Sequence, residues 1–96
     1  MATVKWTEEA ESTLRDVHDY ISRNRPTTAR RTIESILSKV SGLAAYPTLG
    51  QRYPYDPNRD VHVLTYGHFR IAYRIEASGE VLVLGVFHGL IFLPPR

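Results

Sequence analysis

The stretch GHFRIAYRI, residues 67–75, decides the fold because it alternates large apolar side chains with arginines. Successive side chains of a strand point to opposite faces of a sheet, so this alternation predicts a strand with two different faces. The face predicted to lie on the core carries Phe69, Ile71, Tyr73 and Ile75. The other face carries Arg70 and Arg74, and it could be a solvated surface, a phosphate site or a docking face for an acidic partner.

Two further strands are predicted beside this one. Runs of apolar and β-branched residues at 61–66 and 81–88 flank a central strand at 69–76. The connections at 67–68 and 77–80 are short enough to be hairpin turns. The three strands are therefore predicted to form an antiparallel meander.

Two amphipathic helices are predicted before the meander. Thr7 is a good N-cap, and acidic residues follow it where a helix dipole favours negative charge. Apolar residues then recur at intervals of three and four, which is the spacing of one helical face. The two stripes are Ala10, Leu14, Val17 and Ile21, then Ala29, Ile33, Ile36, Val40 and Leu43. The short connection around Pro26 requires the helices to pack as an antiparallel hairpin.

The order of elements predicts the fold class. Residues 3–6 are a short first strand, so the order is strand, helix, helix, strand, strand, strand. Two helices can cover only one face of a sheet, which predicts an α+β fold with two layers, the helix hairpin on a mainly antiparallel four-stranded sheet. Residues 45–58, with three prolines and three tyrosines, are a structured loop. The chain of 96 residues is predicted to be a single domain, 1–96.

Composition excludes several classes of function. The chain has no cysteine, which excludes thiol chemistry and fits a reducing cytoplasm, and we expect a soluble, cytoplasmic protein without a signal peptide or membrane span. A net charge of +2 is too weak to identify a nucleic-acid binder. Neither a metal nor a cofactor is expected, because the histidines lack close ligand spacing. These are His18, His62, His68 and His88.

The last strand is apolar on both faces, although the helix hairpin covers only one. Strict alternation places Val81, Val83 and Phe87 on one face and Leu82, Leu84 and Val86 on the other. Leaving large apolar side chains exposed forgoes about 1.5–3 kcal/mol each, so the second group should be covered. The cover is either the chain's own end, residues 90–96, or a partner protein.

At this point the sequence resembles the RelE/ParE superfamily of toxins from type II toxin–antitoxin pairs. The resemblance rests on motifs in a fixed order over nearly the whole chain. In the first half of the chain they are Val4-Lys5-Trp6-Thr7 with Ala10, the stripe from Leu14 to Tyr20-Ile21, and Pro26 with Ala29. The segment from Leu43 to Gly50, with Pro47, then matches the family pattern L-x-x-x-P-x-x-G. Arg70-Ile71-Ala72-Tyr73-Arg74 matches R-I-x-Y-R, and Val86-Phe87-His88-Gly89 matches V-x-H-G.

The resemblance implies one of two targets. RelE-like members cleave messenger RNA in the ribosomal A site, whereas ParE-like members poison DNA gyrase. Cleavage needs a proton acceptor, an acid and cations, which RelE-like members take from an arginine on the middle strand of the meander, basic residues on the preceding strand and a cluster near the C-terminus. Here Arg70, His62 and His88 are what the sequence offers at these places, and residues 90–93 add no arginine or tyrosine.

This incomplete set favours the ParE branch, a toxin that inhibits gyrase by binding and is neutralised by a cognate antitoxin. The alternative is a RelE-like endoribonuclease that acts on ribosome-bound mRNA through Arg70 and His88. Antitoxins of the superfamily are typically acidic and fold on binding, which suits a surface with both arginines and apolar area. The residues predicted to bind the antitoxin are Arg70, Arg74, Leu82, Leu84 and Val86.

Overall fold

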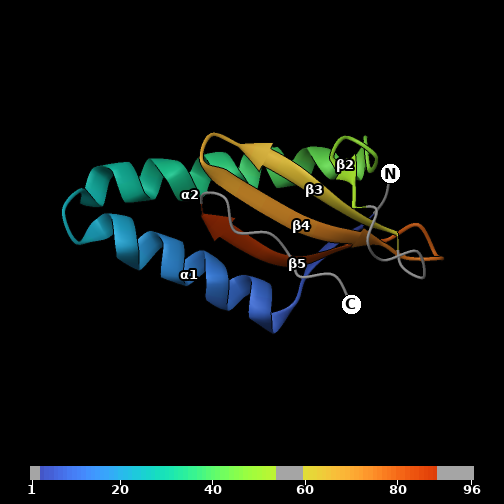
Figure 1. Ribbon diagram of the computed structural model, residues 1–96, viewed down its shortest axis with the longest axis horizontal. Coiled ribbons are helices and arrows are strands. Elements are labelled where there is room, and N and C mark those ends of the chain that lie inside the picture. The colour runs from blue at the N-terminus through green and yellow to red at the C-terminus, as the bar shows by residue number, and fades with distance from the viewer. Residues whose placement is uncertain (1–2, 54–59, 89–96) are drawn as a thin grey trace.

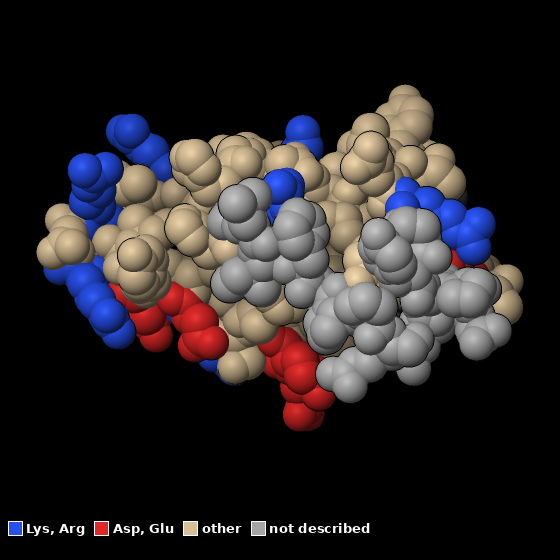
Figure 2. All heavy atoms as spheres, in the orientation of Figure 1, with Lys and Arg blue, Asp and Glu red and all other residues tan. Residues whose placement is uncertain are grey.

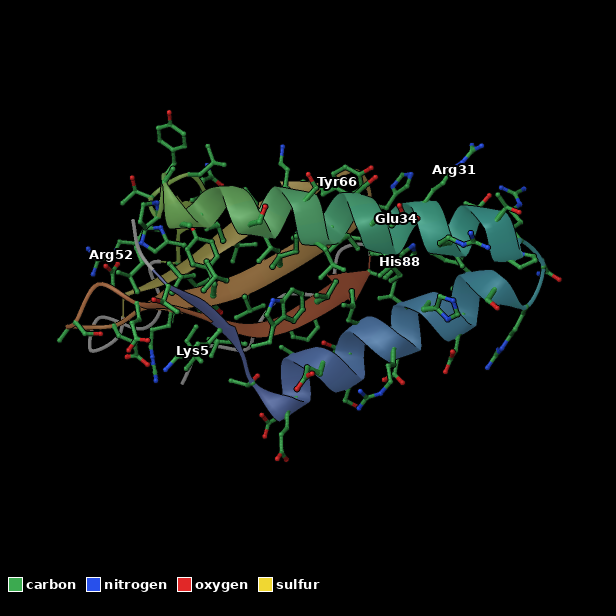
Figure 3. All side chains as sticks on the ribbon, turned by 180° about the vertical axis from the view of Figure 1, so that it is seen from behind. Lys5, Arg31, Glu34, Arg52, Tyr66 and His88 are labelled. Atoms are coloured by element: carbon green, nitrogen blue, oxygen red, sulfur yellow. The ribbon has the colours of Figure 1, made fainter. Side chains whose placement is uncertain are left out.

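A helix hairpin lies against one face of a five-stranded sheet in the computed structural model, which describes residues 3–53 and 60–88 (Figure 1). The elements are β1 (Val4–Trp6), α1 (Glu8–Ser22), α2 (Pro26–Ser41), the 3₁₀ turn η1 (Gly42–Ala44), β2 (Gln51–Arg52), β3 (Val61–Tyr66), β4 (Phe69–Ile75) and β5 (Val81–His88). The helices lie behind the sheet in Figure 1 and in front of it in Figure 3. The sheet face turned away from them is called the open face below.

The sheet follows the order β1-β5-β4-β3-β2. β1 pairs with β5 in parallel, and the other neighbours are antiparallel. The fold is therefore of the predicted α+β class with two layers. The sheet has one strand more than predicted. Gln51–Arg52, within the segment predicted to be a loop, forms β2 and pairs with Val63 and His62 of β3.

The first helix begins at the predicted cap. Thr7 Oγ1 accepts a hydrogen bond from the Ala10 amide at 3.0 Å and donates one to the Val83 carbonyl at 3.0 Å. Glu8, Glu9 and Glu11 then occupy the first turn. The same hydroxyl thus caps the helix and ties it to the middle of β5.

The predicted apolar stripes of both helices face the core. From α1, Ala10 and Val17 are buried, and Leu14 and Ile21 pack beside them. From α2 and η1, the fully buried residues are Ala29, Ile36, Val40 and Leu43. Ile36, Val40 and Leu43 belong to one core cluster with the β4 and β5 residues Ile71, Tyr73, Val81, Val83 and Val86. The core therefore lies between the helix layer and one face of the sheet, as the spacing of the apolar residues predicts.

A β-bulge interrupts the pairing of β4 with β5. Ala72 pairs with Gly85 whereas the next residue of β4, Tyr73, pairs with Val83. Leu84 is therefore an extra residue on β5. Such an insertion shifts the alternation of side chains by one position for the rest of the strand.

The bulge corrects one predicted site residue. Val86 pairs with Ile71, is 3% exposed and belongs to the core, and its amide donates to Thr13 Oγ1 at 2.9 Å. The prediction that Val86 lies on the open face is wrong, because it assumed unbroken alternation. Phe87 pairs with Arg70 and takes the open-face position instead.

Charged side chains are unevenly distributed over the molecule. Lysines and arginines gather at the end where α1 meets α2, with acidic residues beside them along α1 (Figure 2). Among the described residues, no helix is long and apolar enough to cross a membrane.

Candidate functional site

Two arginines of β4 lie on the open face, each held by a polar neighbour. Arg70 Nη1 donates to Thr65 Oγ1 of β3 at 3.0 Å. Arg74 Nη2 donates to Glu76 Oε1 at 2.9 Å. Both arginines are half-buried, so their stems lie along the sheet while the guanidinium groups stay within reach of a partner.

Half-buried apolar side chains of β5 lie next to these arginines. Leu82 pairs with Arg74 and Phe87 with Arg70 across the β4–β5 ladder. Alternation from Val83 places Leu84 on the same side. None of the three β5 side chains belongs to the core cluster or packs against it. The structure thus brings four of the five predicted antitoxin-binding residues onto one face, with Phe87 in place of Val86.

Gly85 explains how Phe87 lies on the sheet. A Cβ atom at Gly85 would be 2.7 Å from Phe87 Cζ, closer than carbon atoms approach. The ring therefore lies over the backbone of Gly85, where only glycine leaves room. The predicted alternative cover, residues 90–96, falls outside the described residues.

His88 lies on the helix side of the sheet, away from Arg70. Its imidazole makes an edge contact with the Phe69 ring, the centroids 5.2 Å apart, and its centroid is 6.1 Å from that of Tyr20 and 6.3 Å from that of His68. The bulge is the cause, since it transfers His88 together with Val86 to the core side. The two residues of the ribonuclease hypothesis therefore do not converge.

His62, the basic residue of the strand before Arg70, also lies on the helix side. Its ring is 6% exposed and stacks on Tyr73, with centroids 5.4 Å apart. Nδ1 donates to the Gly50 carbonyl at 3.0 Å, and Nε2 is 2.9 Å from Asp60 Oδ1. These contacts hold the loop before β2 against β3, so His62 has a structural role here.

Tyr73 joins the two motif residues of that loop. Its hydroxyl donates to the Pro47 carbonyl at 2.6 Å and accepts from the Gly50 amide at 2.9 Å. Burial raises the pKa of the Tyr73 phenol, the hydrogen bond from Gly50 lowers it, and the charge of Asp60 raises it. A Cβ atom on Gly50 would be 2.9 Å from the Tyr73 hydroxyl oxygen and 2.9 Å from the Val63 backbone, so this position requires glycine.

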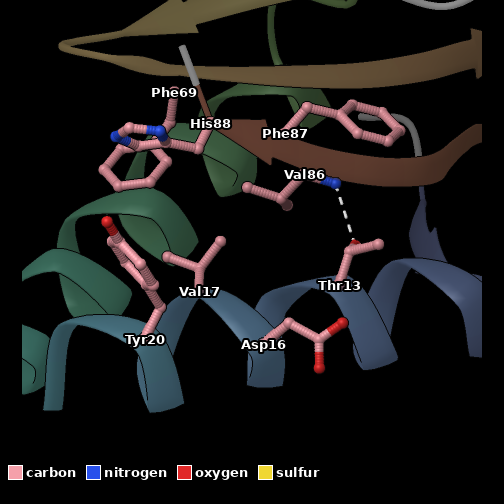
Figure 4. Close-up of a pocket in the computed structure, with 8 residues that line it drawn as sticks. All are labelled: Thr13, Asp16, Val17, Tyr20, Phe69, Val86, Phe87 and His88. Atoms are coloured by element: carbon pink, nitrogen blue, oxygen red, sulfur yellow. Dashed lines mark hydrogen bonds between the residues drawn. The ribbon is translucent and has the colours of Figure 1, made fainter. Parts of the chain in front are cut away.

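A pocket of about 370 Å³ opens between α1 and the end of β5 (Figure 4). Its walls are mainly apolar, and Asp16, Tyr20 and His88 supply its ionisable groups. The lining residues are Thr13, Asp16, Val17, Tyr20, Phe69, Val86, Phe87 and His88. The sequence analysis did not predict this pocket; in the structure Tyr20, which lies in it, is 64% exposed. Within the described part of the chain, no three potential metal ligands come together.

Comparisons with known proteins agree with this architecture. A solved structure from the chromosomal ParDE toxin–antitoxin system of P. aeruginosa is similar, with a TM-score of 0.77 and 23% identity over 93% of this chain and 97% of the other. A chain of the RelBE2 toxin–antitoxin complex from Mycobacterium tuberculosis has a TM-score of 0.66 and 22% identity over 91% and 96%. No curated protein sequence matches significantly.

These likenesses show that the chain shares its small two-layer α+β fold with chains of those toxin–antitoxin systems. The family model described as ParE toxin of type II toxin–antitoxin system, parDE, matches residues 4–90. The chain belongs to this family of ParE toxins, as the motifs of its sequence indicate.

Proposed function

We propose that this ParE-family toxin inhibits DNA gyrase by binding it and is neutralised by a cognate antitoxin. The observation that carries the choice of mechanism is the separation of Arg70 from His62 and His88 by the sheet. RNA cleavage needs a base, an acid and a cation around one phosphate. Side chains on opposite faces of a sheet cannot surround the same phosphate, which supports action by binding.

The antitoxin is proposed to cover the open face around Arg70, Arg74, Leu82, Leu84 and Phe87. Apolar contact with the β5 side chains would supply most of the affinity, and the arginines would pair with acidic residues of the antitoxin, fix its register and speed its association. Higher salt should then slow association more than it speeds dissociation.

The target is tested by two assays run in parallel on the purified toxin. Gyrase supercoiling should be inhibited, while mRNA on programmed ribosomes should stay intact. Cleaved mRNA with unaffected gyrase would reject the proposal in favour of the RelE-like alternative.

The antitoxin surface is tested by Arg70→Ala. This variant should bind the antitoxin at least tenfold more weakly by calorimetry and keep its toxicity when the antitoxin is absent, since a charge-assisted contact is worth about 1.5–3 kcal/mol. Arg52→Ala is the control, because Arg52 is an exposed arginine on β2, and this variant should bind like the parent. Loss of toxicity with unchanged stability and antitoxin affinity would assign chemistry to Arg70 instead.

A further inference from the structure

Four arginines form a basic tip where α1 meets α2. The basic tip consists of Arg23, Arg25, Arg30 and Arg31, all of them exposed. Figure 2 shows Lys and Arg side chains gathered at the end where α1 meets α2, and Figure 3 shows Arg31 and Arg52 at opposite ends of the molecule. Over residues 3–53 and 60–88, no ion pair involves any of the four. Asp19, the nearest acid before Arg23 in the sequence, pairs with His18 at 3.2 Å.

The basic tip gives α2 no evident stability. Arg25 is the N-cap of α2 without a side-chain capping bond, and the first turn of this helix has no acidic residue. Cations at the positive end of a helix dipole are unfavourable, whereas α1 has three glutamates in its own first turn. Arg25 therefore raises the local positive potential at some cost to α2, whereas Arg23, the C-cap of α1, lies where a helix dipole favours a cation.

The surroundings of the basic tip are polar. The exposed large hydrophobic residues are Tyr20, Leu37, Tyr46 and Leu49, and Tyr20 borders the tip one turn before Arg23. A protein interface normally has an apolar or aromatic centre, whereas residues 22–31 contribute no exposed large hydrophobic side chain. Asn24, Thr27 and Thr28 instead add exposed amide and hydroxyl groups, which contact phosphates in nucleic-acid complexes.

We propose that the basic tip docks on the phosphate backbone of duplex nucleic acid. Each guanidinium presents a fork of donors that matches phosphate oxygens. The arginines come from two packed helices, whose axes lie about 8–10 Å apart, so they reach several phosphates at once. This contact is independent of sequence and of the gyrase proposal, because it needs only a polyanionic duplex.

The test is fluorescence anisotropy of the full chain with a labelled DNA duplex of about 20 base pairs. If all four arginines neutralise phosphates, the logarithm of the affinity falls with the logarithm of salt concentration with a slope of about −3.6, or roughly 100-fold between about 50 and 200 mM salt. Arg30→Gln with Arg31→Gln should reduce the slope by about 1.8.

A matched control removes two charges from the same helices. Arg15 and Lys39 are exposed and lie about 12 Å along the helices from the tip, at 1.5 Å per residue. Arg15→Gln with Lys39→Gln should leave the slope unchanged.

Arg25→Asp separates loss of binding from loss of folding. It should weaken duplex binding while the melting temperature stays the same or rises, which excludes unfolding as the cause.

Three results would overturn the inference. They are absence of duplex binding at about 50 mM salt, equal losses in the tip and control variants, and displacement of the duplex by polyglutamate of equal charge, which would assign the tip to an acidic protein. The assay contains no gyrase, so its failure leaves the proposed toxin target untouched.

Discussion

Tyr73→Phe should destabilise the toxin out of proportion to the single oxygen atom that it removes. The hydroxyl holds the Pro47 carbonyl and the Gly50 amide, and Gly50 is buried. A buried amide left without a partner costs about 1–3 kcal/mol, and the hydrogen bond to the half-buried Pro47 carbonyl adds about 1 kcal/mol. The expected loss in the free energy of unfolding is therefore about 2–4 kcal/mol.

Thermal and urea unfolding of purified protein measure this loss. For a domain of this size, each kcal/mol lowers the melting temperature by about 4–8 °C, so a loss of about 2–4 kcal/mol should lower it by about 8–32 °C. Tyr66→Phe is the control, since Tyr66 packs against the same core and its hydroxyl has no recorded hydrogen bond in the described structure. Equal, small losses in both variants would refute the role given to Tyr73.

The pH dependence of the free energy of unfolding gives a second test of the same variant. The folded protein raises the pKa of Tyr73 above 10.0, mainly through burial. The unfolded chain therefore releases this proton first, and the contribution of Tyr73 is complete below about pH 10 and declines as the pH rises through the folded pKa. The stability difference between the parent and Tyr73→Phe should shrink above pH 10. A constant difference would show that the phenol is not shielded.

Three further substitutions test individual contacts. Gly50→Ala should lower the free energy of unfolding, measured with urea, by about 1–3 kcal/mol, because its Cβ would overlap Tyr73. Gly42→Ala should leave it nearly unchanged, because the space around Gly42 is open. Thr7→Ala should cost about 1 kcal/mol through loss of the helix cap, and Thr7→Ser should recover most of it. Phe87→Asp should weaken antitoxin binding at least tenfold by calorimetry with little change in melting temperature; unchanged affinity would place the antitoxin elsewhere.

The helix layer could be predicted from the sequence because its signals are local. The cap at Thr7, the two apolar stripes and the break at Pro26 each depend on neighbours a few residues away, and the structure confirms them. The hairpin at residues 67–68 is also local, since Gly67 has the positive φ of 56° expected at the first position of a tight hairpin turn.

The faces of β5 could not be predicted in the same way. Residues 81–87 are apolar at every position apart from Gly85, so hydrophobic alternation cannot detect an inserted residue. Gly85 was the only local hint of a bulge. The error in Val86 followed from this, and it also concealed that His88 lies on the opposite side from Arg70.

The loop before β2 depends on contacts across the chain. Tyr73 forms hydrogen bonds with Gly50 and Pro47, which lie 23 and 26 positions earlier in the chain. His62 forms one with Gly50, 12 positions earlier. No periodicity marks such pairs. The proline–glycine motif indicated the family, but the reason for its glycine is visible only when the Tyr73 ring is seen against Gly50.

Inhibition of gyrase supercoiling by an Arg70→Ala, His88→Ala double variant, with the antitoxin absent, is the most direct test of action by binding. The account predicts that the variant inhibits as strongly as the parent toxin, and that the concentration needed rises in proportion to the amount of gyrase. A parent toxin without effect on gyrase, or a folded double variant that no longer inhibits it, would contradict the account.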